Sequence, residues 1–300
     1  MKRLFLYIFF ATSICNAQQT KMRENNKTDL EKLNLTGKVK SVKEFTQIST
    51  NKDSLILDTE KEFNVNGFLI KETVYSYGNI HSTTEYNYIN DKLNTETEKI
   101  IGPNGYTTVT NYFYKENEIE SKSFEDDELV ESSILKMDKY NNVVYSKNNN
   151  NLFGTFCEKN FVYNQNNQLT TMTESCYNED GKNYGNTITY TYVDGLLQKM
   201  KHSNTITNDE VGFEERYAYD SSNNCKEIKV YINNVLESRQ SMTYKNGLLE
   251  EHYFTEKGKE TKSIIYKYDS KKNVNMKTIN EVGSVATITT VYIYEMEYYK

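Results

Sequence analysis

Apolar and polar residues alternate along most of the chain, which is the pattern of half-buried β-strands. In residues 82–88, for example, Tyr86 and Tyr88 share one face, whereas Glu85 and Asn87 lie on the other. A helical pattern is confined to one short turn near Asp29, which is a candidate helix cap. The pattern therefore predicts an all-β protein.

One unit recurs along the chain: two aromatic residues separated by one position, then a polar turn, then an aliphatic residue. We take the second aromatic as the anchor of each unit, and successive anchors are about 26 residues apart. Met137 occupies this position in a weaker copy. The unit reads as strand, tight turn, strand and looser turn, repeated about ten times. The anchors are Phe63, Tyr88, Tyr114, Tyr163, Tyr192, Tyr219, Tyr244, Tyr268 and Tyr294.

The spacing from anchor to aliphatic residue predicts two kinds of tight turn. A spacing of five encloses Asp194-Gly195 or Asn246-Gly247, and both central positions of such a two-residue turn need a positive φ. A spacing of six, as from Phe63 to Leu69, places Gly67 or an asparagine where a three-residue loop needs a left-handed residue. Either spacing sets the anchor directly across the hairpin from its aliphatic partner.

About ten hairpins make about twenty strands, and open sheets rarely exceed about ten strands without curling. A closed barrel of this size would have a lumen too wide for side chains to fill. We therefore expect an antiparallel meander that forms a coiled or open twisted sheet.

The strings Tyr219-Asp220-Ser221-Ser222-Asn223 and Tyr268-Asp269-Ser270-Lys271-Lys272 resemble the tyrosine-aspartate (YD, or RHS) repeat, in degenerate copies that cover nearly all of the chain after its leader. The resemblance implies an extracellular or envelope scaffold whose hairpins coil into a shell, often associated with carbohydrate. It carries no catalytic residues to transfer. The repeats here run to the C-terminus and leave no separate toxin domain.

Composition narrows the classes of partner. The chain has 26 Tyr and no Trp, and its mean hydropathy is −0.78. Tyrosine must therefore supply much of the core, and we favour that role for the anchors over an exposed ladder that stacks on sugars. The net charge of −6 argues against nucleic acid as a partner.

The first residues read as a secretory leader, with Lys2 and Arg3 before a short apolar run and Ala17 at the cleavage position. Lipidation of Cys15 is the alternative, although Thr12 and Ile14 fit it poorly. We expect a signal peptide at 1–17, a linker with a short helical turn at 18–36 and one hairpin-repeat domain at 37–300. The mature chain would be periplasmic, cell-surface or extracellular, and not membrane-spanning, because no second apolar segment follows.

No residue pattern points to catalysis, a metal or a cofactor. His81, His202 and His252 are scattered without metal spacing, and the chain lacks a nucleophile motif or a singled-out carboxylate pair. We expect a non-catalytic exported scaffold that binds an unidentified protein or glycan. The alternatives are a carbohydrate-binding protein with exposed tyrosines and a polysaccharide-active enzyme.

Three cysteines remain after export, of which Cys225 takes an aliphatic position and reads as a buried free thiol. Cys157 and Cys176 lie on the two arms of the Tyr163–Leu169 hairpin and form a candidate disulfide. Simple pairing puts Cys176 one residue out of register, on the other face. A β-bulge between them would correct the mismatch and allow the bridge.

Overall fold

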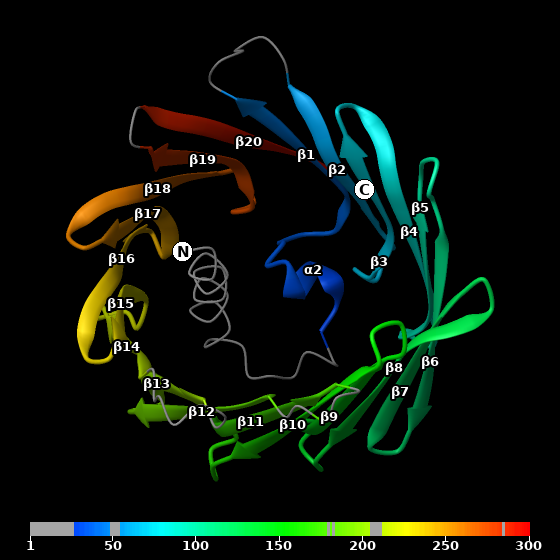
Figure 1. Cartoon of the computed structure of the whole chain (residues 1–300). Helices are drawn as coiled ribbons and strands as arrows, with labels where there is room; N and C mark the ends of the chain where they lie inside the picture. The colour runs from blue at the N-terminus through cyan, green and yellow to red at the C-terminus, as the bar shows by residue number, and fades with distance from the viewer. Residues whose placement is uncertain (1–26, 49–54, 179–180, 182–183, 205–211, 284–285) are drawn as a thin grey trace.

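The computed structural model describes residues 27–48, 55–178, 181, 184–204, 212–283 and 286–300. These residues form one 20-stranded antiparallel sheet in which each strand pairs with the next along the chain. The last strand returns to pair with the first, so the ring of strands in Figure 1 is a closed barrel. The strands are β1 (Val39–Ile48), β2 (Ile56–Phe63), β3 (Leu69–Ser76), β4 (Asn79–Ile89), β5 (Lys92–Ile100), β6 (Thr107–Lys115), β7 (Glu118–Glu125), β8 (Glu128–Met137), β9 (Val143–Asn150), β10 (Thr155–Tyr163), β11 (Leu169–Tyr177), β12 (Tyr184–Val193), β13 (Leu196–Asn204), β14 (Phe213–Tyr219), β15 (Cys225–Ile232), β16 (Val235–Lys245), β17 (Leu248–Glu256), β18 (Lys259–Tyr268), β19 (Val274–Val282) and β20 (Thr287–Tyr298).

The expected open or coiled sheet is wrong, and so is the YD-repeat or RHS-repeat assignment that implied it. The ladder between β1 and β20 runs from Val39 opposite Tyr298 to Ile48 opposite Thr290 and joins the two ends of the meander. Closure removes both unpaired sheet edges. The argument against a barrel assumed that side chains alone must fill the lumen, whereas here part of the chain itself enters it, as described below.

Within the meander, every anchor from Phe63 to Tyr268 lies opposite the aliphatic residue of its own hairpin. Most of these hairpins carry a register shift one residue before the anchor, where a β-bulge inserts an extra residue in the following strand. Tyr294 instead faces Glu44 across the closing seam. The pairs are Phe63–Leu69, Tyr88–Leu93, Tyr114–Ile119, Met137–Val143, Tyr163–Leu169, Tyr192–Leu197, Tyr219–Cys225, Tyr244–Leu249 and Tyr268–Val274.

The tight turns follow the chemistry of their residues. Gly67, Gly195 and Gly247 have φ values of +89°, +82° and +76°. In the longer turns, the residue after the anchor accepts two backbone N–H groups of the loop, as Asp269 does from Lys271 at 2.8 Å and from Asn273 at 2.9 Å. All these turns lie at one end of the barrel, which we call the tight-turn rim.

Successive hairpins are joined near this rim by tyrosine hydroxyls. The backbone ladder between β17 and β18 ends at Glu251 opposite Ile265, three residues before the anchor Tyr268. Beyond that point the Tyr268 hydroxyl donates to the carbonyl of Leu249 at 2.7 Å. We call this contact the tyrosine clasp. It recurs as Tyr114 to Leu93, Tyr163 to Val143, Tyr219 to Leu197 and Tyr244 to Cys225, at 2.8–2.9 Å.

The hairpin that has methionine at the anchor position shows what the clasp replaces. Met137 has no hydroxyl, and the ladder between β7 and β8 there continues to Glu118 opposite Lys136. The backbone N–H of Met137 then donates to the carbonyl of Asn117 at 2.9 Å. The two strands therefore stay paired to the rim by backbone bonds where the tyrosine is missing.

The two faces of the barrel wall differ in chemistry. The anchors face the lumen, and residues next to them along each strand point outward. Outward-facing glutamates pair with lysine or arginine, as Glu214 does with Lys199 and Arg216. Further outward pairs are Lys43–Glu60, Lys122–Glu120, Lys147–Glu158, Lys229–Glu227 and Arg239–Glu227.

Among the described residues, one short helix precedes the barrel: α2 (Asp29–Lys32), which is capped by Thr28 rather than by Asp29. The Thr28 hydroxyl accepts the Glu31 N–H, and the Glu31 carboxylate accepts the Thr28 N–H at 2.7 Å. Together these bonds form a capping box. Within the described residues, no helix is both long and apolar enough to cross a membrane.

The clasp predicts a measurable loss when one hydroxyl is removed. Tyr268→Phe leaves the Leu249 carbonyl without its partner and should lower the free energy of unfolding by about 1–2 kcal/mol. Tyr77→Phe is the control, because Tyr77 is 93% exposed, and it should change that free energy by less than about 0.5 kcal/mol. Urea unfolding of the mature chain measures both, and equal effects would contradict a stabilising role for the clasp.

Candidate functional site

The lumen contains a cavity of about 910 Å³ near the tight-turn rim. Its wall is mainly aliphatic and tyrosine side chains, with amide side chains such as Asn167 and Gln168 among them, and its few charged residues include Glu44 and Lys61. The volume lies within the range of about 300–1,000 Å³ that is common for small-molecule sites. The tyrosines that line it are Tyr163, Tyr190, Tyr192, Tyr219, Tyr244, Tyr266, Tyr268 and Tyr294.

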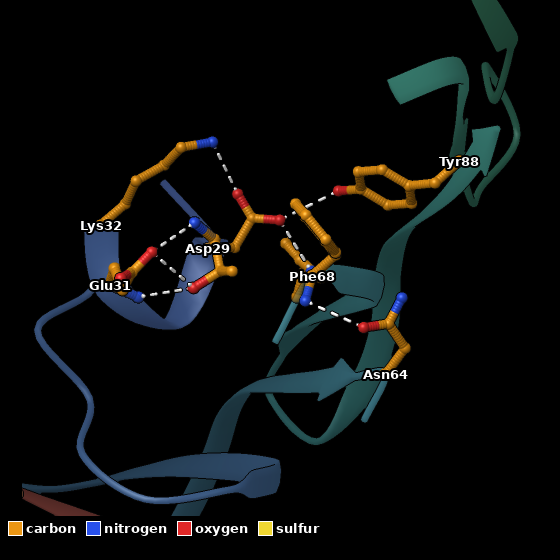
Figure 2. A network of polar contacts seen from close by, with 8 residues as sticks. Asp29, Glu31, Lys32, Asn64, Phe68 and Tyr88 are labelled. Carbon is orange, nitrogen blue, oxygen red and sulfur yellow. Dashed lines mark hydrogen bonds and ion pairs between the residues drawn. The ribbon is translucent and has the colours of Figure 1, made fainter. Parts of the chain in front are cut away.

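Residues 28–38, which we call the strap, lie inside the ring of strands and close part of this cavity (Figure 1). At the start of the strap, one carboxylate oxygen of Asp29 accepts the Leu69 N–H at 2.8 Å and the Tyr88 hydroxyl at 2.9 Å. The other oxygen pairs with Lys32 at 2.9 Å, and Figure 2 shows these contacts. Asp29 thus stands where a direct clasp from Tyr88 to the preceding hairpin would otherwise form.

The next residue of the strap fixes α2 against the β2–β3 turn. The Leu30 N–H donates to the carbonyl of Gly67 at 3.1 Å, and the buried Leu30 side chain packs with Phe63 and Val39. A Cβ on Gly67 would lie 3.2 Å from Leu30 Cδ1. Glycine is therefore needed at position 67 both for the turn and for seating the helix.

The far end of the strap is held on the other side of the closing seam. Asn273, in the turn between β18 and β19, accepts the Thr36 N–H at 2.6 Å and donates to the Thr36 carbonyl at 2.9 Å. Asn273 also donates to the hydroxyl of Tyr298 at 2.8 Å. Between the two ends, Leu33, Asn34 and Leu35 line the cavity.

The cavity tyrosines differ in how their hydroxyls are used. Several have their hydroxyls engaged in clasps, whereas those of Tyr190, Tyr192 and Tyr266 form no hydrogen bond within the described part of the chain. Burial raises the pKa of Tyr190 to about 12, so its hydroxyl is neutral at physiological pH. These free hydroxyls can donate to or accept from a bound molecule.

Deeper along the same wall, polar side chains are buried among apolar ones on β13 to β17. Glu215 is 2% exposed, accepts a hydrogen bond from the Tyr217 hydroxyl, and has its pKa raised by burial. His252 bonds Gln240 at 3.0 Å, and the Nε2 atom of His202 has no partner in the described structure. Burial lowers the pKa of each histidine to about 4, so both are neutral.

The remaining sequence-predicted residues also face the lumen. Cys157 and Cys176 lie directly opposite each other and form a disulfide, because the β10–β11 hairpin contains a bulge next to Tyr163. Cys225 is a buried free thiol that lines the cavity. The anchors are brought together as a ring around the rim, and within the described residues no acidic, histidine or cysteine cluster suits a metal ion.

Sequence reasoning missed the strap and the buried polar row. The sequence presents Asp29 only as a candidate helix cap, and nothing in the sequence places it beside Tyr88. Glu215 directly follows Glu214 in the sequence, and two adjacent glutamates are common on the surface of a strand. The alternation of faces was the signal that could have separated the inward Glu215 from the ion-paired Glu214.

No protein-family model matches the chain, and no curated protein is detectably similar to it. Solved structures are similar at low identity. A porin-like protein from Bacteroides uniformis is 14% identical over 86% of this chain and 98% of its own, with a TM-score of 0.41. A porin-like protein from Bacteroides vulgatus is 12% identical over 70% and 100%, with a TM-score of 0.31. The TcdB2–TccC3–Cdc42 structure is 12% identical over 83% of this chain and 16% of its own, with a TM-score of 0.35. These TM-scores are too low to carry over a function.

The prediction that the chain is not membrane-spanning is wrong, because it weighed only apolar segments of helix length. The fold is a closed β-barrel, and closed barrels are one of the two backbone forms that can span a bilayer. The length of apolar segments therefore does not decide this question for the present chain.

The disulfide predicts a thiol count. The mature chain, cleaved after Ala17, should show one reactive thiol when denatured without reductant, and Cys225→Ser should show none. Reduction should lower the free energy of unfolding by about 3 kcal/mol, because the bridge closes a loop of roughly twenty residues. Three reactive thiols in the unreduced chain would contradict the bridge.

The buried histidines predict a loss of stability in acid. Between pH 6.5 and about 4 the unfolded chain protonates His202, whereas the folded protein keeps it neutral. The free energy of unfolding should therefore fall as the pH decreases through this window and stay level above it. Protonation of Glu215 changes the stability in the opposite direction, because its pKa is raised in the folded protein. Comparing the wild type with His202→Gln, which keeps Glu215, therefore isolates the contribution of His202. The wild type should lose roughly 2–3 kcal/mol more than this variant by pH 4, and parallel urea-unfolding curves would refute the assignment.

Proposed function

We propose that this protein is a non-catalytic, exported binding protein whose barrel lumen holds an amphipathic small molecule with a long apolar part. The observation that carries the proposal is the lumen cavity of about 910 Å³ with its mainly aliphatic and tyrosine wall. Removing an apolar molecule from water into this cavity contributes about 25 cal/mol of favourable free energy per Å² of buried apolar surface.

The free hydroxyls of Tyr190, Tyr192 and Tyr266 support a ligand that also has a polar group. A hydroxyl, ether or carboxylate on the ligand would bond these side chains and leave the clasped tyrosines undisturbed. The cavity wall contains few charged residues, which favours an uncharged or singly charged molecule over a polyelectrolyte.

Two further observations support the remaining parts of the proposal. The Cys157–Cys176 disulfide fits export to an oxidising compartment, which the leader pattern indicates; the leader itself lies outside the described residues. The buried carboxyl of Glu215 has a tyrosine hydroxyl as neighbour rather than a second carboxylate or a nucleophile, which favours binding over catalysis.

Binding of N-phenyl-1-naphthylamine, a neutral apolar dye that fluoresces out of water, tests the proposal. Val42 lines the cavity, whereas the neighbouring Lys43 faces outward and is partly exposed. Val42→Trp should weaken dye binding at least about tenfold by filling the cavity, and Lys43→Trp, which adds the same ring outside, should change it less than about twofold.

Competition then identifies the ligand class. Palmitate should displace the dye, and soluble oligosaccharides should not. Absence of dye binding by the wild type, or equal binding by the two tryptophan variants, would refute the lumen as the site. Displacement by oligosaccharides alone would replace the proposal with glycan binding.

A further inference from the structure

The strap closes the cavity at the rim without being a strand of the barrel. Its middle residues Leu33 to Leu35 line the cavity, and the backbone hydrogen bonds of this stretch run within the strap itself. Leu35, for example, donates to the carbonyl of Leu30 at 2.8 Å. Leu35 also packs against the apolar cluster of Leu30, Val39 and Phe63, so an apolar contact rather than strand pairing holds the middle of the strap.

The two ends of the strap are held in different ways. The far end continues directly into β1 and is bonded to Asn273 through both the N–H and the carbonyl of Thr36. The near end depends on Asp29, whose single carboxylate oxygen joins Leu69 and Tyr88, and on the seat of Leu30 at Gly67. The near end can thus separate while the far end stays attached.

We propose that the strap is the gate of the lumen and that the Asp29 carboxylate is its latch. Release of Asp29 from Leu69 and Tyr88 would let residues 28–35 turn about the attachment at Thr36 and open the cavity to the rim. This inference rests on the proposed binding function, since it names how the ligand would reach the same cavity.

The free thiol of Cys225 offers a test that needs no ligand, because it lies in the cavity wall. The rate at which 5,5′-dithiobis(2-nitrobenzoate) modifies Cys225 in the native, unreduced protein reports access to the cavity. Asp29→Ala should raise this rate at least about tenfold, because two hydrogen bonds to a charged group are lost. Tyr88→Phe, which removes one of these bonds and keeps the ring, should raise it by about threefold.

Lys32→Ala is the matched control, because Lys32 lies in the same helical turn and pairs only with the other oxygen of Asp29, at 2.9 Å. It should change the rate less than about twofold, as expected for an exposed ion pair. Amide hydrogen exchange separates gating from unfolding: Leu30 and Leu35 should exchange faster in Asp29→Ala, while Ile228 in the barrel wall keeps its protection.

Equal modification rates in all four proteins would overturn the gate. Faster exchange of Leu30 and Leu35 without faster modification would overturn it as well, since the strap would then be a structural tie alone. If Asp29→Ala does not fold, the modification rates of Tyr88→Phe and Lys32→Ala are compared instead, and equal rates in these two variants would overturn the gate. Dye binding to the wild type is a separate result, so the gate and the binding function can fail independently.

Discussion

Near the tight-turn rim, the barrel depends on a hydrogen bond that crosses from one hairpin to the hairpin before it, and five tyrosines of the described chain form this bond. Backbone ladders join strands within a hairpin up to the turn, but the ladders between hairpins end short of the rim, and the tyrosine clasp takes over there. A phenol suits this position, because its ring packs in the lumen while its hydroxyl reaches a carbonyl that would otherwise be unpaired. Met137 supports this interpretation, since without a hydroxyl its strand stays backbone-paired to the rim.

This use of tyrosine explains how so hydrophilic a chain encloses an apolar cavity. Aromatic and aliphatic side chains gather near the tight turns and face inward, while outward positions hold ion pairs such as Glu214 with Lys199. Exposed ion pairs contribute little to stability. The fold is therefore held by the inner wall and the clasps, and tyrosines left without a clasp, such as Tyr190 and Tyr192, are the ones available to a ligand.

The hairpins could be predicted from the sequence because turn residues and spacing determine them locally. The closure of the barrel could not, because it depends on the geometry of all the strands together. The pairing of Tyr268 with Val274 follows from turn spacing alone, and the Tyr-Asp string reflects one anchor followed by a residue that caps the loop. That string belongs to the hairpin rather than to an open sheet, which is why the family resemblance misled. Whether β20 meets β1 depends on twist and stagger summed over the whole meander, and inward and outward positions alternate identically in an open sheet and in a barrel.

The strap shows the same division within the site. Its helical turn could be read from the sequence, but its position beside Tyr88 could not, because Asp29 and Tyr88 are 59 residues apart in sequence. The contact nevertheless follows the pattern of the other hairpins, in which the anchor hydroxyl donates toward the preceding hairpin. The Tyr88 hydroxyl would reach toward Leu69 if this hairpin copied the others, and Asp29 stands between them, accepting from both. The near end of the strap is therefore held by the same kind of hydrogen bond from a tyrosine hydroxyl that joins the hairpins of the wall. Here, however, the acceptor is a single carboxylate, which can separate from its partners without breaking the pairing of any strand. This makes the near end of the strap the part of the structure best suited to move.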